Sequence, residues 1–164
     1  MSEVHPTTRD YRVQDRHARQ YLRRSDGVKL KSSTAGTYDG HLRQYEIFLQ
    51  DRDKSILDAE FDDLLDFIAH CVRIGNRQGT IGGKISTIGG LYRHIRLYTE
   101  DRDMLSFDPL RIRTIDLSEY NTPEPIEREA LSRAEIRQLF DAFDSYRNRL
   151  MAVVGVETGL RNSD

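Results

Sequence analysis

Three stretches of this sequence repeat apolar residues at helical spacing, and this periodicity limits the possible folds more than any other feature. Residues 33–50 carry Tyr38, Leu42, Tyr45, Phe48 and Leu49 on one face. Residues 58–74 carry Phe61, Leu64, Leu65, Ile68, Cys71 and Val72, and residues 80–98 carry Ile81, Ile85, Ile88, Leu91, Tyr92 and Ile95. Intervals of three and four residues align side chains along one side of an α-helix. The pattern predicts an all-α fold in which three amphipathic helices share one core.

The segment before these helices is polar and rich in arginine. It carries Arg9, Arg12, Arg16, Arg19, Arg23 and Arg24, whereas its apolar residues form only a thin stripe. The pattern predicts a marginal helix followed by a loop over residues 25–33. Two interpretations fit it: a solvated helix that leads into the bundle, or a basic arm that meets phosphate groups.

A linker and a second set of helices follow the bundle. Three prolines and mixed charges over residues 106–130 are typical of a linker. Ser132 and Glu135 then have the spacing of a capping box, which predicts a helix start at Ser132, and a further helix is expected from about Ser145 to Gly159.

The expected organisation therefore has four parts. It comprises a lead-in over residues 1–30, a helical bundle over residues 31–105, the linker over residues 106–130, and the first two helices of a second domain over residues 131–164.

Charge is unevenly distributed along the chain. The 164 residues hold 25 lysines and arginines against 27 aspartates and glutamates, and this net charge of −2 argues against nucleic-acid binding. Residues 72–99, however, contain no acidic residue and include Arg73, Arg77, Lys84, Arg93 and Arg96. This basic stretch favours a local surface that binds phosphate groups.

Several classes of function lack the residues that they need. Cys71 is the only cysteine, so an internal disulfide is impossible, and the histidines have no partners spaced for a metal site or a catalytic triad. No glycine-rich nucleotide-binding loop is present. The sequence shows no long apolar run and no secretory signal, so we expect a cytoplasmic protein with no membrane span, metal or other cofactor.

The third predicted helix contains an unusual number of glycines. Gly82, Gly83, Gly89 and Gly90 each cost about 1 kcal/mol relative to alanine, and they lie on or beside the side of the helix opposite the isoleucine stripe. Close approach of a DNA backbone would explain a face without bulk, with serine, threonine and arginine contacting the phosphates. Tight packing against another helix, or a break in the helix at the glycine pairs, explains it equally well.

The sequence ETGLRNSD closes the chain and contains Arg161, a candidate for phosphate binding. The preceding helix is expected to end at Gly159, so the turn would hold the guanidinium at a fixed place. Arginine suits phosphate binding because its planar group donates to two oxygens at once and stays charged. Without further information, a surface role for such an arginine is the more common one.

Two stretches resemble the tyrosine recombinases of the phage integrase family. The sequence ALSRAEIRQLFDAF followed by RNRLMAVVGVETGLRNSD resembles the start of their catalytic domain, where a Thr-Gly-x-Arg motif ends an apolar helix. Upstream, TAGTYDGHLRQYEIFL and QGTIGGKISTIGGLYRHI resemble their core-binding domain, a SAM-like helical bundle that binds DNA.

This resemblance implies site-specific cleavage and rejoining of duplex DNA through a 3′-phosphotyrosine, without a metal or nucleotide cofactor. Arg161 would be the first of two arginines that hold the scissile phosphate, and Asp164 stands where the family commonly has glutamate. The residues expected to bind DNA are Lys31, Thr37, Arg43, Arg77, Thr80, Lys84, Ser86, Thr87, Arg93 and Arg96.

The family's remaining catalytic elements, including the nucleophilic tyrosine, would follow Asp164. We therefore expect a truncated chain that binds duplex DNA but does not recombine it alone. Full-length members act as tetramers on two DNA sites, whereas this chain is expected to be monomeric.

Two other functions remain open. The chain could be a stand-alone regulator that occupies recombination sites, or a helical module whose glycine faces meet another protein. The protein-interaction module predicts no salt-sensitive affinity for DNA.

Overall fold

The computed structural model describes residues 10–124 and 132–158, and every described segment of regular structure is helical. The chain divides into two compact units, residues 1–125 and residues 126–164. No strand occurs in the described ranges, which confirms the predicted all-α class.

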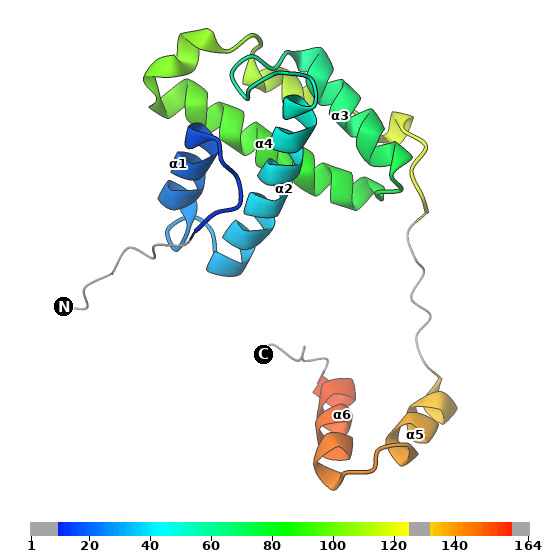
Figure 1. Ribbon diagram of the computed structural model, residues 1–164. Helices are drawn as coiled ribbons and strands as arrows, with labels where there is room; N and C mark the ends of the chain where they lie inside the picture. The colour runs from blue at the N-terminus through cyan, green and yellow to red at the C-terminus, as the bar shows by residue number, and fades with distance from the viewer. Residues whose placement is uncertain (1–9, 125–131, 159–164) are drawn as a thin grey trace, which may run out of the picture. The chain divides into compact units, whose positions relative to one another are not determined.

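The first unit is a bundle of four α-helices with short 3-10 helices after it (Figure 1). The α-helices are α1 (Arg16–Ser25), α2 (Ser32–Gln50), α3 (Phe61–Arg73) and α4 (Gln78–Tyr98). The 3-10 helices are η1 (Glu100–Met104), η2 (Pro109–Thr114) and η3 (Leu117–Glu119). Figure 1 shows α2 crossing α4. Each of these two helices packs against both α1 and α3, whereas α1 and α3 are not a main packing pair.

Helix α4 is the central element of this unit. It packs against α1, α2, α3 and all three 3-10 helices. Its isoleucine stripe is buried as predicted, and the helix runs unbroken through both glycine pairs. The possibility that the glycine pairs break the helix is therefore wrong, because packing against the neighbouring helices outweighs their low helix propensity.

Two buried tyrosines join α2, α4 and the loop before α3. The hydroxyl oxygens of Tyr45 and Tyr92 lie 3.0 Å apart, and the Tyr92 hydroxyl donates to the carbonyl of Ile56 at 3.0 Å. Phe67 packs edge-on against Tyr45, with ring centroids 5.1 Å apart. Because each buried hydroxyl has a partner, these rings fill the core without an unsatisfied polar group.

An extended segment before α1 is held by two buried carboxylates of α2. Asp39 accepts hydrogen bonds from the amides of Arg12 and Val13, both at 3.0 Å. Glu46 accepts from the amides of Gln14 at 3.0 Å and Asp15 at 2.6 Å. Hydrogen bonds to a charged acceptor are stronger than neutral ones, so this carboxylate clamp, formed by Asp39 and Glu46, fixes where α1 begins.

Helix α1 is a packed part of the bundle rather than a solvated lead-in. Ala18 and Leu22 are fully buried against the core, together with Val13 before the helix. Asp15 caps the helix by accepting from the amides of His17 and Ala18, at 2.8 and 3.0 Å. The thin apolar stripe of this segment is therefore sufficient to dock it.

Two boundaries differ from the sequence-based expectation. Helix α3 begins at Phe61 rather than at Asp58, because the amide of Glu60 donates to the Asp63 carboxylate at 2.8 Å and starts the helix there. Part of the expected linker also packs on the bundle, since Phe107 and Ile112 are both buried.

The second unit contains α5 (Arg133–Asp141) and α6 (Tyr146–Thr158), which pack against each other. The predicted capping box is present: the amide of Ser132 donates to Glu135 at 2.8 Å, and the amide of Glu135 donates to the Ser132 hydroxyl at 3.3 Å. The predicted helix end at Gly159 lies outside the described residues.

The glycines of α4 face other parts of the protein. An added Cβ atom would lie 3.6 Å from Leu117 at Gly82, 3.6 Å from His41 at Gly83, and 3.4 Å from Ile112 at Gly89. At Gly90 it would lie only 2.5 Å from the Tyr21 hydroxyl oxygen. Of the two explanations for this face, the structure supports close internal packing and contradicts a bare outer surface.

The burial of Gly89 gives a testable prediction. Gly89→Glu should lower the free energy of unfolding by about 2–4 kcal/mol, because it forces a carboxylate against the buried Ile112 side chain. Urea unfolding of the whole chain measures this change. Ser86→Glu is the matched control, since Ser86 is exposed on the same helix and its substitution should change stability by less than about 0.5 kcal/mol. A Gly89→Glu protein as stable as the control would show that this face is open.

Candidate nucleic-acid interface

Six of the residues predicted to bind DNA are exposed and form no ion pair with a described residue. They are Lys31, Thr37, Arg77, Thr80, Ser86 and Arg93. Arg77 and Arg93 lie near opposite ends of α4, about 24 Å apart at the helical rise of 1.5 Å per residue. Side chains so far apart would meet different phosphates of a duplex. Sixteen residues also turn them to different sides of the helix, whereas Ser86 and Arg93, two helical turns apart, share one exposed face of α4.

Two predicted residues are buried and do not belong to such a face. Lys84 is 4% exposed, and its ammonium group donates to the Asn76 side chain at 2.6 Å and lies 3.6 Å from the Cys71 sulfur. Thr87 is fully buried, donates to the Gly83 carbonyl at 2.9 Å and lies 3.0 Å from His41 Nδ1. Both predictions are wrong because α4 is covered on the sides where these residues project.

Two further predicted residues are engaged with carboxylates. Arg43 lies 2.6 Å from the Glu46 carboxylate of the clamp. Arg96 forms an ion pair with Asp108, the residue that precedes η2. Both guanidinium groups are therefore partly neutralised inside the unit, so a phosphate would have to compete with a carboxylate for each of them.

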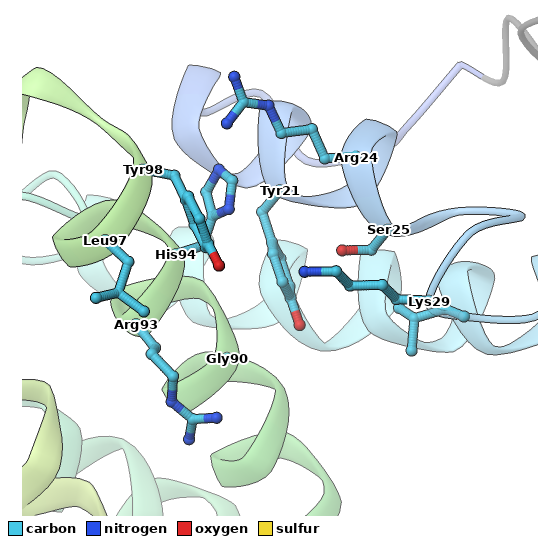
Figure 2. A pocket seen from close by; sticks show the side chains of 10 residues that line it. Tyr21, Arg24, Ser25, Lys29, Gly90, Arg93, His94, Leu97 and Tyr98 are labelled. Carbon is cyan, nitrogen blue, oxygen red and sulfur yellow. The ribbon is translucent and has the colours of Figure 1, made fainter.

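A basic cavity not predicted from the sequence lies between α1, the α1–α2 loop and the C-terminal half of α4 (Figure 2). Its volume is about 490 Å³. The basic cavity is lined by Tyr21, Arg24, Ser25, Lys29, Leu30, Gly90, Arg93, His94, Leu97 and Tyr98. Arg93 connects it to the exposed face described above, and no lining residue is acidic.

The three cations of this cavity have no carboxylate partner in the described parts of the chain. No aspartate or glutamate oxygen there lies within 4.0 Å of the charged groups of Arg24, Lys29 or Arg93. Lys29 instead lies 5.6 Å from the centre of the Tyr98 ring, at the distance of a cation–π contact. Uncompensated positive charge around a cavity attracts anions.

The electrostatics of the cavity wall act on its titratable groups. His94 is 7% exposed, and burial lowers its pKa, as do the nearby charges of Arg24, Lys29 and His17. Burial also raises the pKa of Tyr21, an effect that Tyr38 increases and Arg93 opposes. Both side chains are therefore expected to be neutral near pH 7, so the cations set the charge of the cavity.

Glycine at position 90 allows the cavity wall to form. The Tyr21 hydroxyl occupies the space where any other residue at this position would place its Cβ atom. Helix α1 can therefore approach α4 closely, and this approach sets Arg24 opposite Arg93 across the basic cavity in Figure 2. The sequence showed that glycine was unusual here, but no periodicity could pair residue 21 with residue 90.

The described residues show neither a metal site nor a membrane-spanning helix. They contain no group of three or more histidine, cysteine, aspartate or glutamate side chains arranged to hold a metal ion. No helix among them is both long and apolar enough to cross a membrane. The predicted catalytic residue, Arg161, lies outside the described residues.

Comparison with known proteins identifies the helical unit. A family model described as "Phage integrase, N-terminal SAM-like domain" matches residues 21–96. These residues extend from α1 through almost all of α4 and include Arg24, Lys29 and Arg93. Searches of curated proteins and of solved structures gave no significant match. Residues 21–96 thus belong to the phage integrase N-terminal SAM-like domain family, the core-binding, DNA-binding domain of integrases.

Proposed function

We propose that this chain binds duplex DNA as the core-binding part of a site-specific tyrosine recombinase. The exposed face of α4 and the basic cavity beside it would lie against the phosphate backbone. Arg93 would belong to both parts, and Arg24 and Lys29 would add charge from α1 and from the loop after it.

The observation that carries this proposal is the absence of acidic groups around three unpaired cations. Some other arginines of the unit are paired: Arg16 lies 2.7 Å from Asp101, and Arg43 lies 2.6 Å from Glu46. A protein with a net charge of −2 that leaves one cluster without counterions concentrates its positive potential there. Phosphate groups of DNA are the ligand that the matched family suggests for this potential.

Salt dependence tests the proposal directly. If about four to six phosphates are neutralised, the logarithm of the association constant should fall against the logarithm of salt concentration with a slope of roughly −4 to −5. Arg93→Ala should weaken binding about tenfold and make the slope shallower by about one, because one phosphate contact is lost. Fluorescence anisotropy with a labelled duplex measures both quantities.

The matched control for this experiment is Arg102→Ala. Arg102 is exposed on η1 and lies 3.9 Å from Asp103, so its removal changes the net charge equally but leaves the proposed face intact. Its affinity should stay within about twofold of the original protein. Equal losses for the two variants would indicate an effect of net charge alone, and binding that is absent or indifferent to salt would exclude the proposal.

A helical protein-interaction module remains the alternative function. It was suggested by glycine faces that were expected to meet another protein. The glycines of α4 meet side chains of the same unit instead, including Ile112 and Leu117. The main support for this alternative is therefore lost, although a protein that binds no DNA would revive it.

We also propose that Arg161 binds the scissile phosphate, as the resemblance of ETGLRNSD to the family's Thr-Gly-x-Arg motif implies. The capping box at Ser132 and the helix Tyr146–Thr158 agree with the order of elements before that motif. As a tyrosine attacks the phosphodiester, negative charge grows on the non-bridging oxygens. A preplaced guanidinium would stabilise that charge more than it stabilises the ground state.

Substitution of Arg161 tests its role. In a longer chain that joins this sequence to the family's other catalytic elements, Arg161→Ala should slow formation of the covalent DNA adduct about 10²- to 10³-fold. Affinity for DNA should fall far less, because the helical unit supplies most phosphate contacts. A suicide substrate analysed on a denaturing gel measures the adduct. Undiminished cleavage by the variant would show that the motif is misassigned.

A further inference from the structure

The basic cavity has features that a simple phosphate-contacting surface does not need. Its volume of about 490 Å³ lies within the range of about 300–1,000 Å³ that is usual for small-molecule sites. A duplex backbone needs only exposed cations, which the outer face of α4 already provides. The hollow itself, between α1 and α4, therefore calls for a separate explanation.

Aromatic rings line this cavity beside its cations. His94 lies between two tyrosines: its ring centroid is 5.6 Å from that of Tyr21 and 5.4 Å from that of Tyr98 (Figure 2). Tyr98 is 56% exposed, and the neighbouring Leu97 is 61% exposed. An exposed ring at the mouth of a cavity offers a flat apolar surface for a planar group, as in sites that stack single bases.

A buried polar atom in the same wall has no partner. His94 Nε2 is inaccessible to solvent and makes no hydrogen bond with any described residue. A buried nitrogen without a partner costs free energy that the fold does not recover. A polar group of a ligand that reaches this nitrogen would satisfy it.

The charges specify the anionic part of such a ligand. Arg24 projects from α1, Lys29 from the loop, and Arg93 from α4; Figure 2 shows the ends of the Arg24 and Arg93 side chains on opposite sides of the cavity and Lys29 between them. Phosphate carries several acceptor oxygens and can contact cations on different sides at once. The combination of three cations with an exposed aromatic ring fits a phosphate that is attached to a planar base.

We propose that the basic cavity binds one unpaired nucleotide, with its phosphate among Arg24, Lys29 and Arg93 and its base stacked on Tyr98. A base inside a duplex cannot stack on a side chain, so the nucleotide belongs to a single-stranded end or an unpaired position of DNA. This inference rests on the proposed DNA binding for the source of the nucleotide. A free mononucleotide has the same chemistry and is the other source that the experiment distinguishes.

The test compares two labelled DNA molecules with the full 164-residue chain. One is a blunt duplex, and the other is the same duplex with a short thymidine overhang. Stacking of one base on an aromatic ring typically favours binding by about fivefold or more, so the overhang should bind at least about fivefold tighter. Thymidine monophosphate should compete for the overhang preference, whereas inorganic phosphate at the same concentration should compete much less.

Substitutions of Tyr98 assign the preference to the cavity. Tyr98→Ala should reduce the ratio of overhang to blunt affinity to about one, whereas Tyr98→Phe retains the ring and should keep the ratio. Tyr98 is the last residue of α4 and is mostly exposed, so neither change should unfold the bundle, and circular dichroism checks this. A preference that is absent, or that survives Tyr98→Ala, overturns the inference.

The outcomes also separate this inference from the proposed function. Salt-dependent binding of the blunt duplex without any overhang preference would support DNA binding and overturn the nucleotide site. Absence of all DNA binding would exclude the proposed function. In that case quenching of tyrosine fluorescence by thymidine monophosphate, lost in Tyr98→Ala, would support a site for a free nucleotide, and no quenching would overturn it.

Discussion

The arrangement of the helical unit depends on two buried carboxylates of α2. Asp39 and Glu46 are 6% and 5% exposed, and together they accept hydrogen bonds from four consecutive backbone amides before α1. Burying a carboxylate costs free energy unless it accepts hydrogen bonds. Here the donors are backbone amides that no other element of the unit would satisfy. The clamp thereby fixes the start of α1, and the direction of α1 determines where Tyr21 and Arg24 lie.

The same placement explains the glycines of α4. Neighbouring elements cover α4 on most sides, and its small residues admit Ile112 on one side and Tyr21 on another. Glycine in a helix is tolerated where neighbouring elements supply the packing that a side chain would otherwise give. Helix α1 approaches α4 closely at Gly90, and the basic cavity lies next to this contact. The glycine that allows the helices to pack closely therefore also shapes the candidate site.

The sequence predicted the helices well, because their apolar residues recur with a clear helical period. It also predicted the capping box at Ser132, since that motif is local. The sequence did not predict which residues of α4 are buried by contacts with distant parts of the chain. Lys84 and Thr87 belong to a helix that is covered on most sides, whereas the periodicity of the sequence alone placed them on its solvent-exposed face. The basic cavity was missed for the same reason, because it joins Arg24 and Lys29 to Arg93 across more than sixty residues.

The central claim is that DNA lies against the face formed by α1, the following loop and the C-terminal half of α4. A titration of the ¹⁵N-labelled full chain with duplex DNA, followed by nuclear magnetic resonance, tests it residue by residue. The largest amide shifts should fall at Arg24, Lys29, Gly90 and Arg93, while the acidic start of α3 around Asp62 should change little. Shifts concentrated on α3 and absent from these four positions would contradict the account.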